Sequence, residues 1–362
     1  MFDGLYGRIP AGHYWRDEIL DVELDKIFRP SWLLVGFSDD LKAHNDFITA
    51  QIGPHSIVVQ NFKGELKAFR NVCSHRFSRI QTEACGNRRL QCPYHHWLYD
   101  AQGVPRGIPD NDAMFGLDDA GRVALALTPY RLELCGRYVF VCMGEAPPLR
   151  EFLGRVHDDL EYFSAACPDR ISQTSVEMEV NWKVGFENAA EGYHVRVIHK
   201  ESLGPTLADD LGIDFVGDHS VYYRALTDET RGWWRRMARI IKLQDGGRFP
   251  DSTNYILFPH TVGLATYGAS IVLQTYEPIS ATRFRCNTSY WLADGPKGPA
   301  RDAVVENLKA LSTRIMTEDS DICKGVQAGV VEAGDRAPLL GRPENRIAHF
   351  QQAYARRMEA AA

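Results

Sequence analysis

The chain has 362 residues, of which 44% are hydrophobic and 24% charged, and its formal net charge is −6. That length is sufficient for two domains. The negative balance offers no electrostatic attraction to nucleic acid or to an anionic membrane surface. No stretch approaches the roughly 18 to 20 apolar residues that a membrane span requires. The N-terminus lacks a basic segment followed by an apolar run, so we expect a cytoplasmic protein without a signal peptide.

Eight cysteines in a chain of this length do not form the dense framework of a small disulfide-bonded domain. Cys73 and Cys92 belong to a motif described below. We expect the remaining cysteines to be reduced thiols, most of them buried. They are Cys85, Cys135, Cys142, Cys167, Cys286 and Cys323.

Residues 1–36 open with a helical pattern, in which Ile19, Val22 and Ile27 recur at helical spacing. Pro30 ends that pattern because its ring cannot continue a helix. We expect this N-terminal segment to pack on a later domain rather than fold alone.

Residues 37–148 consist of short β-strand patterns separated by turns. Two alternating runs, 56–61 and 66–70, flank Lys63-Gly64, which is typical of an antiparallel hairpin. A further strand is predicted at 138–142, and Pro147-Pro148 marks a linker. These patterns predict an all-β domain over 37–148.

Residues 149–362 combine helices with an antiparallel sheet, which indicates an α+β domain. Helices are predicted over 150–163, 301–331 and 346–358, the second with an apolar stripe that includes Val304, Leu308 and Ile322. The predicted strands are 173–180, 221–224, 253–258, 261–266, 270–276 and 283–291.

Four metal-binding side chains occur as two pairs in the all-β domain. Cys73 and His75 are two positions apart, and Cys92 and His95 follow after a long spacer. A zinc finger would pair cysteine with cysteine and histidine with histidine. Two thiolates and two imidazoles instead match a [2Fe–2S] cluster with a cysteine-bound iron and a histidine-bound iron.

The residues around these pairs resemble a Rieske iron–sulfur domain. Pro93-Tyr94 lies within the second pair and Trp97 just after it. The sequence departs from the family at Phe77 and His96, where glycine is usual. His96 is an alternative ligand to His95, although the spacing favours His95, and Cys85 in the spacer is a less favoured further thiolate.

A second group of candidate ligands lies at His194 and His199, with Glu191 three residues before His194. Histidines five positions apart are separated by about 140° on an ideal helix. Both can bind one metal only if the helix is irregular or broken between them. A carboxylate would complete a 2-His-1-carboxylate site for non-haem Fe(II).

Together, Asn181-Trp-Lys, Glu187-Asn188, Glu191-x-Tyr-His194 and His199 are similar to the catalytic motif of Rieske non-haem iron oxygenases, the alpha subunits of the aromatic-ring-hydroxylating dioxygenase family. The resemblance implies a Rieske domain followed by a catalytic domain with a helix-grip, START-like fold. It also implies a third iron ligand from a late helix. The Glu-Asp pattern ahead of Val-Gln327 favours Asp319, and Asp321 is the alternative.

The resemblance assigns two further roles around the mononuclear iron. Glu191, where many relatives have aspartate, would bridge His95 of one subunit to His194 of the next in a head-to-tail ring. A homotrimer is the simplest such ring. Asn188 is a candidate polar group near the iron.

The expected activity needs electrons from outside the chain. The sequence has no Gly-x-Gly pair, so the glycine fingerprint of a dinucleotide site is absent. We therefore expect a separate NAD(P)H-dependent reductase, with or without a ferredoxin. The chain would be a terminal oxygenase that uses O2 to hydroxylate a small organic substrate.

Two substrate classes remain open. An aromatic compound, as in aromatic hydrocarbon catabolism, is the first expectation from the resemblance. The alternative is a carnitine- or betaine-like quaternary ammonium or N-methyl compound, which an aromatic cage could bind. A Rieske electron carrier without catalysis is a third hypothesis. Seven aromatic residues are candidates for the pocket: Phe215, Tyr222, Trp233, Trp234, Tyr255, Phe258 and Tyr267.

Overall fold

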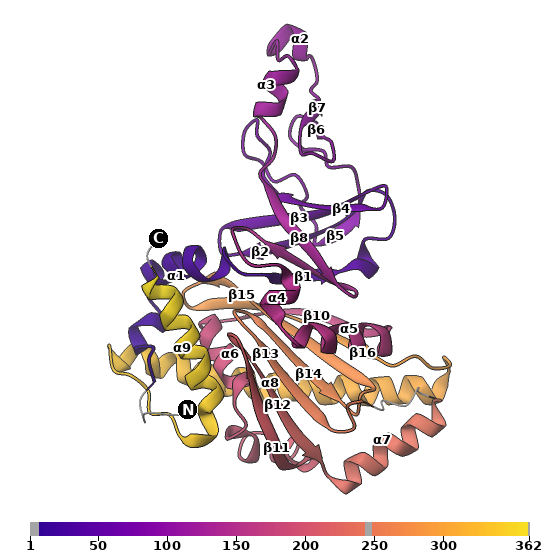
Figure 1. Ribbon diagram of the computed structural model, residues 1–362, viewed down its shortest axis with the longest axis vertical. Coiled ribbons are helices and arrows are strands. Elements are labelled where there is room, and N and C mark those ends of the chain that lie inside the picture. Colours follow the sequence, from indigo (N-terminus) through magenta and orange to yellow (C-terminus); the bar gives the residue numbers. More distant parts are fainter. Residues whose placement is uncertain (1–6, 243–247, 361–362) are drawn as a thin grey trace. The chain divides into compact units, whose positions relative to one another are not determined.

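The structure is a computed structural model that describes residues 7–242 and 248–360. The chain forms two compact units (Figure 1). Phe28–Leu149 form one, which we call the β unit, and Met1–Ile27 with Arg150–Ala362 form the other, which we call the α+β unit. Residues 28–36, which the sequence analysis placed with the N-terminal segment, belong to the β unit because strand β1 pairs there with β9.

The β unit contains a seven-stranded antiparallel sheet in the order β1-β9-β8-β4-β3-β2-β5, together with the two-stranded ribbon β6-β7. Its strands are β1 (Leu33–Phe37), β2 (Asp46–Ile52), β3 (His55–Phe62), β4 (Glu65–Arg70), β5 (Cys85–Asn87), β6 (Leu98–Tyr99), β7 (Pro105–Gly107), β8 (Pro129–Cys135) and β9 (Tyr138–Cys142). Two short helices, α2 (Asn111–Met114) and α3 (Asp119–Ala124), follow β7.

Local sequence explains the hairpins of this sheet. Gly64, between β3 and β4, has a φ of +97°, which only glycine adopts readily, and its N–H donates to Asn61 Oδ1 at 2.7 Å. All five residues of β9 are buried, as their apolar sequence predicts. The sheet therefore supplies a rigid base for the loops between β4 and β6.

The α+β unit contains a second seven-stranded antiparallel sheet, in the order β10-β16-β15-β14-β13-β12-β11. Its strands are β10 (Asp169–Met178), β11 (Leu207–Val216), β12 (His219–Leu226), β13 (Ser252–Leu257), β14 (Thr261–Thr266), β15 (Ser270–Ser280) and β16 (Arg283–Leu292). Its α-helices are α1 (Asp17–Glu23), α4 (Leu149–Leu153), which begins at the unit boundary, α5 (Val156–Ala166), α6 (Trp182–Ala190), α7 (Asp228–Ile240), α8 (Pro299–Ala333) and α9 (Asn345–Glu359).

Helices α6, α8 and α9 lie together against this sheet (Figure 1). Helix α6 contacts α8, α9 and strand β15, and α8 also contacts β10. The 35-residue α8 passes along the sheet, so one helix face can supply both core side chains and side chains of a site. The expected fold, a β domain combined with helices on an antiparallel sheet, is confirmed.

Three local expectations were wrong. Strand β11 was not predicted, because it is an edge strand with polar, solvent-exposed residues that give no apolar alternation. Val22 is 38% exposed, whereas the neighbouring Glu23 is fully buried. On α8 the buried stripe continues through Cys323, and Ile322 is 39% exposed.

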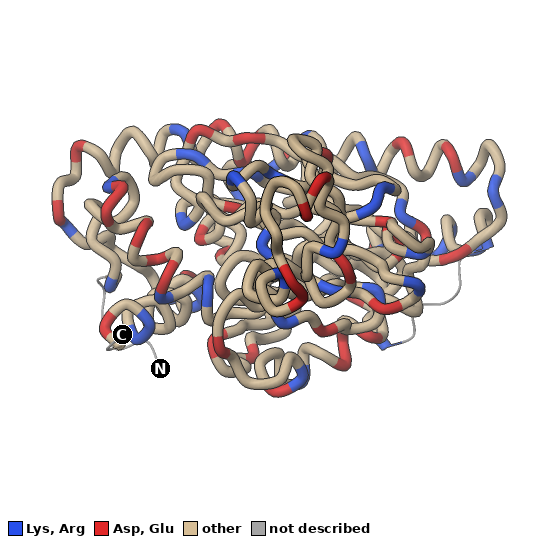
Figure 2. The backbone as a smooth tube through the Cα atoms, turned by 90° about the horizontal axis from the view of Figure 1, so that it is seen from above, with Lys and Arg blue, Asp and Glu red and all other residues tan. Residues whose placement is uncertain are grey.

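No helix among the described residues is long and apolar enough to cross a membrane. Acidic and basic positions are interspersed along the chain in Figure 2, rather than separated into fields of one sign.

Candidate metal centres and their cavity

The two Cys/His pairs of the β unit lie on loops with the same backbone turn. The N–H of Phe77 donates to Cys73 O, and the N–H of His96 donates to Cys92 O, both at 3.0 Å. Phe77 and His96 both have positive φ values, +59° and +60°. These are the two positions where the sequence departs from the glycine usual in Rieske domains. The preference for glycine there has a backbone cause, because side chains disfavour this conformation.

The equivalent turns bring the four candidate ligands together. The imidazole centroids of His75 and His95 are 4.6 Å apart, and both Cys73 and Cys92 are 1% exposed. Nδ1 of His75 is buried and has no hydrogen-bond partner among the described residues, as expected of a nitrogen that binds a metal. Burial raises the pKa of the Cys73 thiol and so favours the neutral thiol, whereas a bound metal ion would favour the thiolate. The four residues fit a cluster with two thiolate and two imidazole ligands.

Both alternative ligands, Cys85 and His96, are exposed to solvent. Cys85 is exposed in strand β5, which pairs with β2. The side chain of His96 is exposed, whereas the ring of His95 faces that of His75.

Two aromatic side chains support this group. The indole of Trp97 stacks on His75 with ring centroids 4.8 Å apart and an interplanar angle of 5°. The hydroxyl of Tyr99 lies 3.0 Å from Cys73 Sγ and also accepts the Ser74 N–H at 3.1 Å. No pattern in the sequence singles out Tyr99, because its contact with Cys73 Sγ forms only when the loops fold.

The second group forms where helix α6 ends. The helix stops at Ala190, Glu191 is extended, and a short 3-10 helix begins at His194. The break that the five-residue spacing requires is therefore present. The backbone of Glu191 has left the helix, and its carboxylate reaches the His194 ring.

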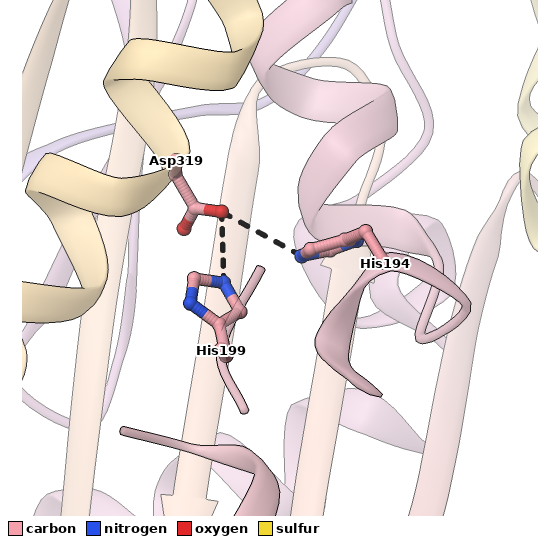
Figure 3. A group of neighbouring side chains, drawn as sticks. All are labelled: His194, His199 and Asp319. Carbon is pink, nitrogen blue, oxygen red and sulfur yellow. Dashed lines mark hydrogen bonds and ion pairs between the residues drawn. The ribbon is translucent and has the colours of Figure 1, made fainter. Parts of the chain in front are cut away.

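Both histidines point toward Asp319 of helix α8 (Figure 3). Asp319 Oδ1 lies 3.0 Å from His199 Nε2 and 3.6 Å from His194 Nε2. One ligand atom from each residue lies within 4.8 Å of the other two, which is close enough for one ion to bind all three. This donor set suits non-haem Fe(II), with positions left open for other ligands.

The electrostatics of the group favour a cation. Burial raises the pKa of Asp319, but hydrogen bonds with His194 and His199 outweigh it and keep the pKa well below its usual value. Burial likewise lowers the pKa of His194, but Asp319 and Glu191 outweigh it and raise the pKa to about 9. The carboxylates thus attract positive charge to the imidazoles, and a metal ion competes with protons for the same nitrogen atoms.

Three side chains orient these candidate ligands. Asn188 Nδ2 donates to Asp319 Oδ1 at 2.8 Å. Glu191 accepts a hydrogen bond from His194 Nδ1, and Glu318 Oε2 accepts one from His199 Nδ1 at 2.7 Å. Each imidazole is therefore held at Nδ1 while its Nε2 faces Asp319, the arrangement common around metal-binding histidines.

Glu318 was not recognised as functional from the sequence. Its carboxylate also accepts hydrogen bonds from Ser202 Oγ at 2.5 Å and from Arg314 Nε at 2.9 Å. The available signal was its position beside Asp319. Asp321, the alternative third ligand, forms an ion pair with Lys324 at 3.3 Å and is 71% exposed.

A separate interaction fixes α8 to α6. Asn181 caps α6 by accepting the Lys183 N–H at 2.9 Å, and its own N–H donates to Gln327 Oε1 at 2.7 Å. Gln327 lies two turns after Asp319 on α8 and is buried. The hydrogen bond between Asn181 and Gln327 thus holds α8, which carries Asp319, next to α6, which carries Asn188.

A cavity of about 480 Å³ reaches the three candidate ligands. Of the seven aromatic residues expected to line a pocket, Tyr222, Trp233 and Trp234 do so. Aliphatic side chains form much of the remaining wall, including Val262, Leu264, Leu308, Leu311 and Ile315. The other four aromatics do not line it: Phe215 packs on His349, Tyr267 stacks on Trp234, and Tyr255 and Phe258 are buried in the core.

The two units and their metal-binding groups define an iron protein with an iron–sulfur domain and a mononuclear non-haem iron domain. Family models agree: "Ring hydroxylating alpha subunit (catalytic domain)" matches residues 168–360, and "Rieske [2Fe-2S] domain" matches residues 31–129. The chain belongs to the Rieske oxygenase alpha-subunit family, whose cofactors are a [2Fe–2S] cluster and a mononuclear iron.

Similar proteins differ in their named substrates. The glycine betaine monooxygenase oxygenase subunit of Pseudomonas aeruginosa is 30% identical over 206 residues, 56% of this chain and 47% of that protein. The toluate 1,2-dioxygenase subunit alpha of Pseudomonas putida is 32% identical over 212 residues, 54% of this chain and 45% of that protein. The matched region therefore spans about half the length of these relatives.

Among solved structures, the quaternary ammonium Rieske monooxygenase CntA in complex with L-carnitine has a TM-score of 0.78 and 20% identity. The match covers 98% of this chain and 96% of that chain. At this identity, the likeness is evidence of a common fold.

Proposed function

We propose that the chain is the terminal oxygenase component of a Rieske oxygenase system, which uses O2 to hydroxylate a small organic substrate. The proposal depends on one observation: His194, His199 and Asp319 converge at one end of a mainly apolar cavity. An electron carrier without catalysis would have no need for such a group or for the cavity.

In this proposal His194, His199 and Asp319 hold the iron, which supplies oxygen activation when bound. Asn188 keeps one oxygen of Asp319 directed at the histidines, through the 2.8 Å hydrogen bond. Glu191 and Glu318 hold the two rings at Nδ1 and so keep each Nε2 free for the metal. The apolar walls bind the substrate and exclude water from its reacting carbon.

Cys73, His75, Cys92 and His95 are the proposed ligands of the cluster in the β unit. We further propose a cytoplasmic homotrimer in which Glu191 also accepts a hydrogen bond from His95 of the neighbouring subunit. The electrons would come from NAD(P)H through a separate reductase, with or without a ferredoxin.

Two substrate classes have specific support. Tyr222, Trp233 and Trp234 in the cavity wall suit an aromatic ring, and one relative is named for toluate. The same rings suit a quaternary ammonium group by cation–π attraction, and another relative is named for glycine betaine.

The test begins with the iron and acid-labile sulfide content of anaerobically purified protein and its EPR spectrum after reduction. Three irons and two sulfides per chain are expected, with hydroxylated product formed in step with oxygen uptake. His199→Ala should retain the cluster spectrum and lose turnover. A His199→Ala protein that retains full turnover would refute the proposed mechanism.

A further inference from the structure

Arg346, near the start of helix α9, is a buried cation in the wall of the cavity, with 2% of its surface exposed. Its Nε donates to Ser220 Oγ at 3.0 Å and its Nη1 to Asn254 Oδ1 at 2.7 Å. Its Nη2 contacts the backbone oxygens of Ser220 and Asn254 at 3.5 and 3.3 Å. All four acceptors are neutral, and four bonds leave one of the five guanidinium N–H groups free.

This guanidinium lacks the neutralising partner that a buried charge normally has. Arg301, also 2% exposed, forms an ion pair with Asp169 at 2.6 Å. Among the described carboxylates, none contributes to the pKa of Arg346, which burial lowers to about 9. The difference between the two arginines points to an anion that reaches Arg346 from the cavity.

A second arginine is linked to the first through Tyr222 and Asp210. Arg224 of strand β12 also lines the cavity and is 11% exposed. Its Nε lies 3.2 Å from Asp210, whose carboxylate also accepts the Tyr222 hydroxyl. The ring of Tyr222 in turn lies beneath Arg346, 5.5 Å from its Cζ atom. The two guanidinium groups thus adjoin a single carboxylate, Asp210, because Glu191 and Asp319 in the cavity lining are engaged by His194 and His199. We call this part of the cavity the positive end.

The positive end adjoins the loop of the metal-binding group. A Cβ atom built on Gly192 would lie 3.6 Å from the Tyr222 hydroxyl and 3.8 Å from Arg224 Nη1. Gly192 lies two residues before His194. Beyond this end, Leu308, Leu311 and Ile315 make the wall apolar. A ligand that matches the cavity therefore has a short anionic end and an apolar remainder.

We propose that the substrate bears a carboxylate and that Arg346, with Arg224, binds it. The inference rests on the proposed function, because it treats the cavity as the substrate site of the oxygenase. A carboxylate site would restrict both substrate classes. Among aromatic compounds it would select aromatic acids over uncharged arenes, and among quaternary ammonium compounds it would select betaines over choline-like cations. A planar guanidinium recognises a carboxylate by charge-assisted hydrogen bonds, which an amide or alcohol cannot replace.

Matched ligand pairs test this inference by isothermal titration of the iron-loaded protein without reductant. The pairs are benzoate with benzamide, phenylacetate with phenylacetamide, and glycine betaine with choline. At least one carboxylate should bind ten or more times more tightly than its partner. Arg346→Gln should abolish that preference while leaving the affinity for the partner without a carboxylate within about twofold. Absence of a carboxylate preference in all three pairs overturns the inference.

Two controls separate recognition from folding. Arg236→Gln removes an exposed arginine of α7 that does not line the cavity, and should keep the preference. If Arg346→Gln does not fold, the carboxylate preference can be measured in Arg224→Gln instead. The preference should fall less in that variant, because Arg224 already pairs with Asp210. A purely structural role for Arg346 predicts a lower melting temperature with an unchanged affinity ratio, and that result overturns the inference.

Oxygen uptake with a reductase distinguishes failure of this inference from failure of the proposed function. Hydroxylation only of ligands without a carboxylate would support the oxygenase and overturn the carboxylate site. Arginine-dependent carboxylate binding without any oxygen insertion would support the carboxylate site and count against the oxygenase.

Discussion

Replacing Glu318 by glutamine should weaken iron binding at His194, His199 and Asp319 about tenfold, and replacing it by alanine about a hundredfold. Glu318 accepts the His199 Nδ1–H at 2.7 Å and is itself held by Ser202 and Arg314. It therefore fixes both the orientation of the ring and the nitrogen that remains available to the metal.

The two substitutions separate charge from position. Glutamine retains a neutral acceptor for His199 Nδ1 but loses the charge that makes the imidazole a stronger ligand. The affinity for iron should therefore fall only about tenfold. Alanine removes the acceptor as well, so the ring of His199 can rotate and change tautomer. For the alanine variant we therefore expect an affinity for iron about a hundredfold lower.

The assay is a competition titration of Fe(II) against a chelator of known affinity. The EPR spectrum of the reduced cluster serves as an internal control, because the β unit is not altered. Asp321→Asn is the matched control on the same helix, since Asp321 is exposed and pairs only with Lys324 among the described residues. Iron affinity retained within twofold by Glu318→Ala, or iron lost by Asp321→Asn as by Glu318→Ala, would contradict this role of Glu318.

Three other substitutions probe the two units separately. Tyr99→Phe removes a hydroxyl 3.0 Å from Cys73 Sγ, and should lower the cluster potential by about 60 mV in a redox titration, the equivalent of about 1.4 kcal/mol for one electron; an unchanged potential would contradict this. Phe77→Gly relieves a positive φ at an exposed side chain and should raise the free energy of unfolding by about 1 kcal/mol in urea, whereas a loss of stability would show that the aromatic ring contributes more than the backbone strain. Lys183→Met leaves the carboxylate of Glu23 buried without its ion-pair partner at 2.5 Å, so we expect a loss of about 3 to 5 kcal/mol. A loss below about 1 kcal/mol in urea unfolding would refute the importance of that pair.

The candidate ligands were predictable because their chemistry is encoded over short stretches of sequence. Cys73 and His75 are close enough in sequence for their spacing to suggest one metal. His194 and His199, about 140° apart on an ideal helix, were assigned to one metal only with the family motif around them. Asp319 is remote from its partners, and only the resemblance to a family identified it. The structure adds its distance to His199 and the outward direction of Asp321.

The residues that sequence reasoning missed depend on contacts between distant segments. Glu23 is buried in a helix that looked amphipathic with Val22 on its apolar side, because Lys183 and Tyr354 supply its partners from far along the chain. From the sequence alone, a glutamate in this helix is expected to face solvent, because charged side chains are rarely buried without a partner. Val22 was therefore assigned to the buried face in error, whereas Ile27 is fully buried as expected.

Helix α8 shows how the same limit affects a functional site. Its inward-facing positions at four-residue intervals include Ile315, Asp319, Cys323 and Gln327, so two of the four are polar. A purely apolar stripe therefore breaks off after Ile315, and the sequence analysis continued it through Ile322 instead. Asp319 and Gln327 can occupy this face because their oxygen atoms are hydrogen-bonded by His199, in the segment after α6, and by Asn181, the N-cap of α6. The interruption of the apolar pattern is thus a consequence of the site, and in a long amphipathic helix it marks where the helix contributes chemistry rather than packing.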